Sequence, residues 1–275
     1  MKKYKIEKDT VQETLLIPLY GRKLCSERFP TLFADDSAAR LMEKIDYDFS
    51  ALEKRSDSIV QVFGALEVAM RQSDIAWEVR NYLKEHPRAA VINLGCGLDD
   101  TCRMYNIDLP DVIALRERLL PAGEREQNLA LDLRDPKWMD VIDARPSDGA
   151  VLFAAGVFYY FTTAQVRRMI SMAERFPGGR LVFDAAGKTA VKLMLKTWVK
   201  QAGIKDVGAY FSVKNTKAEL KAWSPRLAVS SRGYMLGYQK LDDPSVRPIH
   251  RLLAKIADGP MRLQIVRVDF REVPR

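Results

Sequence analysis

The sequence predicts an α/β fold, in which a mostly parallel sheet with helices on its faces is preceded by a helical cap and closed by an antiparallel hairpin. Three observations lead to this prediction. From residue 90 onward, short apolar segments alternate with amphipathic helical segments, which is typical of a parallel sheet. The residues before them show only helical patterns, and two longer strand-like segments stand near the carboxyl end. We therefore expect a helical cap at 1–86 and an α/β core with substrate-lid insertions at 87–275.

The amino-terminal region predicts two amphipathic helices, at residues 36–45 and 60–85. The second places Val62, Leu66 and Met70 on one face at helical spacing. An apolar face of this kind has to be buried against another element. We expect these helices to cover the open end of the sheet.

The predicted core begins at residues 90–94, a short apolar run of the kind found in central parallel strands. A helix is predicted after Thr162, because Thr162 and Gln165 form a capping-box pattern and a Pro-Gly-Gly sequence ends the helix. The other predicted strands cover residues 103–107, 128–131, 149–154 and 180–184, a further helix covers 188–201, and the closing strands cover 226–238 and 261–270.

The first crossover of this sheet is short. Only about eight residues separate Leu94 from the strand predicted at 103–107, whereas a parallel crossover normally needs a dozen or more and usually contains a helix. Two explanations stay open. Either the chain has lost its first crossover helix, leaving a mobile loop from Asp99 to Arg103, or residues of the protein are missing from the sequence at this point.

Composition narrows the class of protein. The chain has 275 residues, of which 47% are hydrophobic and 29% charged, which is ordinary for a globular protein. A net charge of +8 is typical of proteins that bind nucleic acids. However, Lys and Arg are spread among acids, and no basic block with interleaved aromatic residues occurs. We therefore expect a small-molecule partner and no nucleic acid.

The cysteines and the apolar segments indicate the compartment. Three cysteines without zinc spacing favour free thiols in a reducing environment. No segment has the pattern of a signal peptide or the length of a membrane span. We expect a cytoplasmic protein without a membrane partner and without a metal.

A glycine turn with the sequence GCGLDD follows the first predicted strand at residues 95–100. Glycines let the backbone turn sharply and approach a ligand closely. The dinucleotide fingerprint has a third glycine where this chain has Asp100, and Asp99 with Asp100 would repel a pyrophosphate. S-adenosyl-L-methionine carries a sulfonium and an ammonium, which acids attract. The turn therefore predicts an S-adenosyl-L-methionine site, with a tight turn that binds nothing as the alternative.

Five stretches of the chain resemble the leucine carboxyl methyltransferase family, and in particular its bacterial branch of polyketide (tetracenomycin-type) O-methyltransferases. They are ETLLIPLYGR, LFADDSAARLMEKIDYDFSAL, VINLGCGLDD, YNIDLPDVIALRERLLP and AAGVFYYF. The likeness runs over most of the chain. It implies the Rossmann-like sheet of S-adenosyl-L-methionine-dependent methyltransferases and transfer of a methyl group to oxygen.

The resemblance also implies contacts between individual residues and the cofactor. Asp108 matches the acid that holds the ribose hydroxyls, and Arg71 resembles the arginine that pairs with the cofactor carboxylate. Asp132 and Leu133 match the segment that flanks the adenine. The family has an acid after the fourth strand where this chain has Ala155, so a polar contact is missing from the pattern. The implied cofactor-binding set is Arg71, Gly95, Gly97, Asp99, Asp108, Asp132, Leu133 and Ala155.

Three of these assignments have structural alternatives. Asp108 precedes a Leu-Pro pair and could cap a helix. Asp132 could form a surface salt bridge with Arg134. Arg71 could lie along a helix face with its charge in solvent.

The acceptor is expected to be a carboxylate on a small aromatic or polyketide-like molecule. A carboxylate with a pKa near ~4 is already a nucleophile at pH 7, whereas a phenol with a pKa near ~10 benefits from a base. The sequence offers no nucleophile and histidine pair, and neither His86 nor His250 is placed to act as a base. Following the resemblance, we expect Arg22 to neutralise the acceptor, or to serve the cofactor instead, and Tyr160 to shape the space beside the sulfonium.

Two readings from other classes remain. The high isoelectric point, about 9.3, leaves a nucleic-acid methyltransferase or binding protein as an alternative. Ala155 and the short crossover leave a cofactor-binding protein without catalysis.

Overall fold

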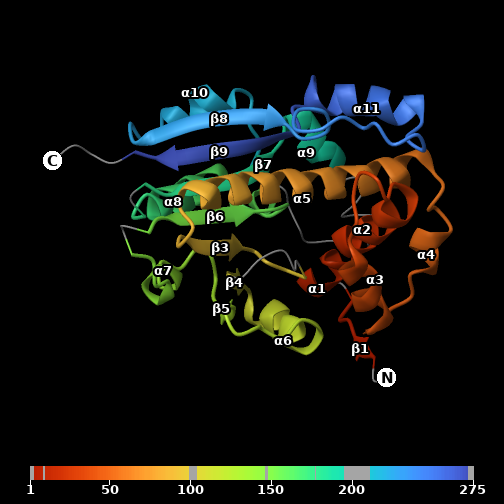
Figure 1. The fold of residues 1–275 in the computed structure, drawn as a ribbon, viewed down its shortest axis with the longest axis horizontal. Helices are drawn as coiled ribbons and strands as arrows, with labels where there is room; N and C mark the ends of the chain where they lie inside the picture. Colours follow the sequence, from red (N-terminus) through yellow and green to blue (C-terminus); the bar gives the residue numbers. More distant parts are fainter. Residues whose placement is uncertain are drawn as a thin grey trace.

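The computed structural model describes residues 3–8, 10–98, 104–145, 148–176, 178–194 and 211–271. Within them, a seven-stranded sheet with the strand order β5-β4-β3-β6-β7-β9-β8 forms the centre of the molecule (Figure 1). The first five strands of this order are parallel, and β9 and β8 join antiparallel. The predicted α/β fold with a mostly parallel sheet is confirmed.

The strands lie close to the predicted positions. Their bounds are β3 (Ala90–Leu94), β4 (Tyr105–Asp108), β5 (Gln127–Ala130), β6 (Ala150–Ala154), β7 (Arg180–Ala185), β8 (Leu227–Gly233) and β9 (Gln264–Phe270). Every residue of β6 and β7 is buried, as expected for parallel strands that are covered on both faces.

Alternate side chains of the central strands pack into two separate apolar clusters. Val151 and Phe153 of β6 belong to one cluster, whereas Leu152 and Ala154 belong to the other. This alternation follows from the two-residue period of a strand. The first cluster also contains apolar residues of the long helix α5 (Ile59–Glu85), which lies across this face of the sheet (Figure 1).

The carboxyl-terminal strands pair antiparallel, as predicted, but no tight turn joins them. The connection from β8 to β9 contains helix α11 (Pro248–Asp258), and β9 lies between β7 and β8. As an interior strand, β9 buries neighbouring residues such as Ile265 and Val266 on opposite faces. This burial explains why its apolar pattern changes phase instead of alternating cleanly.

The amino-terminal helices gather at the end of the sheet toward which the parallel strands point (Figure 1). The side chain of Ser58 caps α5, and that of Asp35 caps α3 by accepting from the backbone amides of Ser37 and Ala38. The remaining amino-terminal elements are β1 (Tyr4–Lys5), α1 (Val11–Thr14), α2 (Leu16–Arg28), α3 (Asp36–Glu43), β2 (Ile45–Asp46) and α4 (Ser50–Glu53).

The core helices begin where their caps predict. Thr162 and Gln165 form both hydrogen bonds of a capping box at the start of α8 (Thr163–Ala173). The helix predicted at 188–201 is described only as α9 (Lys188–Met194), and its remainder lies outside the described residues. The other helices are α6 (Pro110–Leu119), α7 (Trp138–Val141), η1 (Phe158–Tyr160) and α10 (Thr216–Lys221).

The two remaining sequence predictions concern the short first crossover and the absence of a membrane span. The loop predicted from Asp99 to Arg103 lies outside the described residues. Among the described helices, none combines the length and the apolar character that a membrane crossing requires.

Candidate functional site

The glycine turn lies at the carboxyl end of β3, which is an interior strand between β4 and β6. Gly95 and Gly97 have φ angles of 72° and 47°, in the left-handed region that favours glycine. A Cβ atom on Gly95 would lie 2.6 Å from Val157, so the turn also needs glycine for space. The amides of Gly95 and Cys96 both donate to the carbonyl of Ile107 in β4, at 2.8 and 3.1 Å. The turn is therefore folded onto the neighbouring strand.

Asp108, the last residue of β4, points its carboxylate at this turn. Its Oδ2 accepts from the amide of Gly97 at 2.9 Å, and its Oδ1 accepts from the amide of Leu109 at 2.8 Å. Burial raises the pKa of Asp108. The residue does not cap α6, because that helix has no side-chain cap. Each carboxylate oxygen keeps a further lone pair, so Asp108 can also accept from two hydroxyl groups of a ligand.

Arg71 of α5 reaches the carboxyl end of β6 and β7 and forms an ion pair there. Its Nη1 lies 3.2 Å from Oδ2 of Asp184, with side-chain exposures of 14% for Arg71 and 1% for Asp184. The amide of Gly156 donates to the other oxygen of Asp184 at 2.6 Å. A Cβ on Gly156 would lie 3.1 Å from the guanidinium, so glycine at this position makes room for Arg71. Arg71 therefore does not lie along a helix face with its charge in solvent.

The ion pair brings an acid close to position 155, where the sequence pattern lacks one. Position 155 is Ala, but the carboxylate of Asp184 is bonded to the next amide along the chain. An acid from β7 thus lies beside the place where the family has one after β6. Sequence reasoning missed it, although Asp184 ends the strand predicted at 180–184, at the edge where parallel strands present ligands.

A second, half-buried acid, Glu67, lies one helical turn before Arg71. The hydroxyl of Tyr234 donates to Oε1 of Glu67 at 3.2 Å, and burial raises the pKa of Glu67. The hydroxyl of Tyr159 is hydrogen-bonded to Asp184, and burial raises the pKa of Tyr159 as well. The spacing of Glu67 and Arg71 on one helix face was the available signal for this acid.

Tyr160 lies in η1, directly after β6, and 36% of its surface is exposed. It shares the electrostatic environment of Arg71 and Asp184. The side chain is thus in the group of residues at the carboxyl end of β6 and β7. Its predicted role beside the sulfonium stays a prediction.

The segment after β5 carries the residues expected to flank the adenine. Asp132 accepts from Nε of Arg134 with both oxygens, at 2.9 Å each, and this hydrogen bonding lowers its pKa. Leu133 is buried, and its carbonyl accepts from the indole of Trp138 at 3.2 Å. The salt-bridge alternative for Asp132 is thus observed, and an adenine contact stays a prediction.

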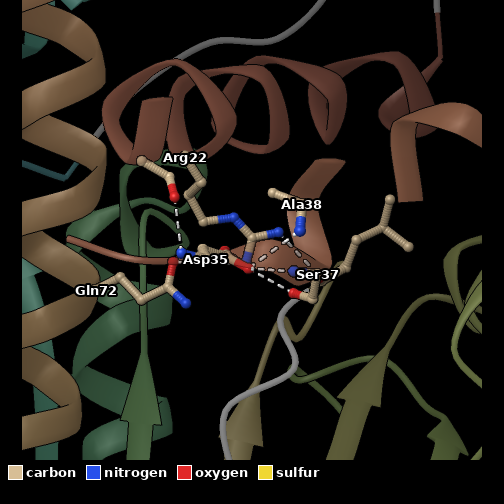
Figure 2. Close-up of polar contacts among 7 residues, drawn as sticks. Arg22, Asp35, Ser37, Ala38 and Gln72 are labelled. Atoms are coloured by element: carbon tan, nitrogen blue, oxygen red, sulfur yellow. Dashed lines mark hydrogen bonds and ion pairs between the residues drawn. The ribbon is translucent and has the colours of Figure 1, made fainter. Parts of the chain in front are cut away.

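Arg22 is engaged inside the protein. Its guanidinium donates to the carbonyl of Leu98, at 3.0 Å, and pairs with Asp35 at 3.5 Å (Figure 2). Leu98 belongs to the glycine turn, so Arg22 contacts the loop that is expected to bind the cofactor. Its two predicted roles, neutralising the acceptor and serving the cofactor, stay predictions. Asp99, also predicted to bind the cofactor, lies outside the described residues.

The histidines lie away from this group. The ring of His86, at the end of α5, stacks on Tyr82 with 4.4 Å between ring centroids, and His250 is buried in α11. Within the described part of the chain, no group of His, Cys, Asp and Glu has the arrangement of a metal site. What the described residues offer are left-handed glycines at two strand ends, a carboxylate that can take hydroxyls, and a buried pair of opposite charges. This set suits a ligand with a ribose and an amino-acid group better than a pyrophosphate.

Comparison with known proteins gives one family. The family model described as leucine carboxyl methyltransferase matches residues 19–174. The tetracenomycin polyketide synthesis O-methyltransferase TcmP of Streptomyces glaucescens is 33% identical over 187 residues, which are 64% of this chain and 66% of that enzyme. The matched region thus spans just under two thirds of its length. An S-adenosyl-L-methionine-dependent methyltransferase of Gibberella zeae is 28% identical over 260 residues, 85% of each chain.

Solved structures share the fold at low sequence identity. A candidate methyltransferase from Thermobifida fusca superposes with a TM-score of 0.59 at 14% identity, covering 97% of this chain and 96% of that one. A DUF574 family protein from Streptomyces avermitilis gives a TM-score of 0.53 at 10% identity, covering 94% and 97%. The arrangement of strands and helices therefore recurs over almost the whole length of other proteins.

Proposed function

The chain belongs to the leucine carboxyl methyltransferase family, and we propose that it is an S-adenosyl-L-methionine-dependent O-methyltransferase that esterifies a carboxylate of a small aromatic or polyketide-like molecule. The observation that carries the proposal is the bond between the amide of Gly97 and the carboxylate of Asp108 at the ends of β3 and β4. It holds a carboxylate that can accept from hydroxyl groups beside a glycine turn that a ligand can approach closely. The two methyltransferase relatives, one of them an O-methyltransferase, support the same activity.

The described residues divide into a cofactor end and an acceptor end. At the cofactor end, Gly95 and Gly97 would leave room for the ligand, and Asp108 would accept from the ribose hydroxyls. Arg71, which pairs with Asp184, would attract the carboxylate of the cofactor, and Asp184 would attract its ammonium. When bound, the cofactor supplies an electrophilic methyl group on its sulfonium. The protein contributes mainly by holding the donor and acceptor atoms at the distance and angle of an in-line displacement.

A carboxylate acceptor needs no base, because it is ionised at pH 7. Among the described residues at this site there is no histidine that could take a proton from a weaker acid. In this proposal, the amino-terminal helices and the region around β8 form the walls of the acceptor pocket. The relationship to a polyketide enzyme supports an aromatic or polyketide-like acceptor.

Methylation of a phenol is the second candidate, and one observation favours it. Glu67 is an acid whose pKa is raised by burial, close to Arg71 and Tyr159. A carboxylate with a raised pKa is a better general base than an ordinary one. Glu67 thus provides the group that a phenolic acceptor would require.

The experiment is an acceptor screen with cofactor labelled in the methyl group. Products are treated with mild alkali, which cleaves methyl esters and spares aryl methyl ethers. We expect alkali-labile label on carboxylic acids. An alkali-stable ether formed from phenols at rates well above any acid would overturn the carboxylate proposal, and labelled RNA would point to the nucleic-acid alternative.

A matched variant separates the two acceptor classes. Glu67→Gln keeps an oxygen that accepts from Tyr234 but cannot take up a proton as a carboxylate does. Ester formation is expected to continue at a similar rate in this variant. Loss of activity on acids in Glu67→Gln, with cofactor binding unchanged, would count against a reaction without a base.

A further inference from the structure

Two buried arginines donate to consecutive carbonyl groups of the glycine turn. Nη1 of Arg116, in α6, donates to the carbonyl of Gly97 at 3.2 Å. Nη2 of Arg22, in α2, donates to the carbonyl of Leu98 at 3.0 Å. Both hydrogen bonds are buried, and both side chains are almost fully covered, with exposures of 2% and 5%. The turn is thus held by guanidinium groups from two separate parts of the chain.

Arg116 is itself anchored to the sheet beneath the turn. Its Nε donates to Oδ1 of Asn128 in β5 at 3.1 Å, and the same oxygen accepts from Asn106 in β4 at 3.0 Å. The amide nitrogen of Asn128 donates in turn to Glu117 at 2.7 Å. These hydrogen bonds fix the guanidinium relative to β4 and β5.

Arg22 is anchored to the amino-terminal helices. Nη1 of its guanidinium lies 3.5 Å from Oδ2 of Asp35 and 3.5 Å from Oε1 of Gln72, and Figure 2 shows the three side chains together. Asp35 is held because its other oxygen accepts from the amides of Ser37 and Ala38 at 3.0 Å and so caps α3. Arg22 therefore joins the turn to α3 and, through Gln72, to α5.

The turn has special need of such support. Only ten residues connect the end of β3 at Leu94 to the start of β4 at Tyr105, which is fewer than a parallel crossover usually has. A buried carbonyl needs a hydrogen-bond donor, and a charged donor forms the stronger bond. A guanidinium has five N–H groups in a rigid fork, so it can hold a carbonyl while it keeps a second partner.

We propose that Arg22 and Arg116 form a guanidinium clamp on the carbonyls of Gly97 and Leu98, which holds the turn in its cofactor-binding conformation from outside the crossover. The purpose of the clamp rests on the proposed function, because the clamp would order the loop that binds the cofactor. Arg22 and Arg116 are positioning residues, since they act through the backbone of the turn. Asp108 accepts from the amide of Gly97, so three side chains restrain two consecutive residues.

The clamp makes the loop conformation measurable without cofactor. Hydrogen exchange of the peptide that contains residues 95–98 is followed by mass spectrometry in the ligand-free protein. Arg22→Met and Arg116→Met remove the donors while keeping most of the apolar stem. Both are expected to raise exchange in this peptide by about tenfold or more, and Arg22→Lys is expected to recover part of the protection, because an ammonium supplies one of the two contacts.

Arg180→Met is the matched control. Arg180 is as deeply buried as Arg22, and it pairs with Glu78 and Asp269 at the start of β7, the opposite end of the strands from the turn. Its loss is expected to lower the melting temperature without selective exchange in the 95–98 peptide. Comparison at equal distance below each melting temperature separates a loosened turn from a loosened fold.

Calorimetry with S-adenosylhomocysteine, the demethylated product, completes the test. Arg22→Met and Arg116→Met are expected to weaken its binding by about tenfold or more, and Arg180→Met is expected to leave it unchanged. Unchanged exchange in the 95–98 peptide of both clamp variants would overturn the clamp, whatever happens to affinity. Absence of binding to the wild-type protein would instead overturn the proposed function, while selective exchange in the variants would still support the clamp.

Discussion

The amide of Gly97 donates to the carboxylate of Asp108 across 2.9 Å, and this bond joins the turn after β3 to the last residue of β4. The two residues are brought together because β3 and β4 are parallel neighbours in register at Leu94 and Ile107. The strand ends therefore meet at one edge of the sheet. The carboxylate is thereby held beside the glycine turn, and we propose that it accepts from the ribose hydroxyls of the cofactor.

The first prediction concerns this carboxylate. Asp108→Asn is expected to weaken S-adenosylhomocysteine binding by roughly 1.5 to 3 kcal/mol, the value of a hydrogen bond to a charged group. Calorimetry measures the effect. Asp111→Asn, which removes a nearby exposed charge from the first turn of α6, is the control and is expected to change the affinity little. Full affinity in Asp108→Asn would show that this acid does not hold the ribose.

The second prediction concerns the buried ion pair of Arg71 and Asp184. Removal of either charge leaves the other uncompensated, so Asp184→Asn and Arg71→Met are each expected to cost about 3 to 5 kcal/mol in the free energy of unfolding. The double variant is expected to cost clearly less than the sum. Urea unfolding of the four proteins gives this coupling, and strictly additive losses would refute it.

The third prediction concerns the backbone of the turn. Gly95→Ala is expected to destabilise the protein by roughly 2 to 4 kcal/mol, because φ is 72° and the new Cβ meets Val157 at 2.6 Å. Val157→Ala in addition is expected to restore only the part of the loss caused by the clash. Denaturant unfolding distinguishes the two parts. Complete recovery in the double variant would mean that the left-handed backbone carries no strain.

The fourth prediction concerns pH. Burial, helped by the charges of Asp258 and Glu78, raises the pKa of Asp74 to about 8, while Arg232 acts in the opposite direction. The folded protein therefore holds this proton more tightly than the unfolded chain, whose Asp titrates near ~4. The stability due to Asp74 is present below about pH 4 and is lost as pH rises toward 8.

Asp74→Asn tests the sign. The variant is expected to be more stable than the wild type at pH 8, on the order of 2 to 4 kcal/mol, with the difference shrinking toward pH 5. Urea unfolding at the two pH values measures it. An unchanged difference between pH 5 and pH 8 would show that Asp74 does not titrate in this range.

Local patterns carried much of the fold. The apolar run at 90–94, the capping box at Thr162 and the glycine turn each depend on neighbours in sequence, and the structure confirms all three. The connection between β8 and β9 was harder to predict, because no short sequence pattern indicates that β9 enters the sheet between β7 and β8.

The candidate site shows the same limit. Gly97 and Asp108 could be matched to motifs, each beside its own strand. The partners of Arg71 and Arg22 could not be predicted from the sequence. Asp184 lies 113 residues from Arg71, and Leu98 lies 76 residues from Arg22. Their contacts depend on how the amino-terminal helices pack on the sheet, which no short segment encodes.

The most direct test of the S-adenosyl-L-methionine site is calorimetric titration of the wild-type protein with S-adenosylhomocysteine and, in parallel, with NAD. We expect saturable binding of one S-adenosylhomocysteine per chain, weakened in Asp108→Asn, and no comparable binding of NAD. Binding of NAD in preference to S-adenosylhomocysteine, or no binding of S-adenosylhomocysteine at all, would contradict the proposed site.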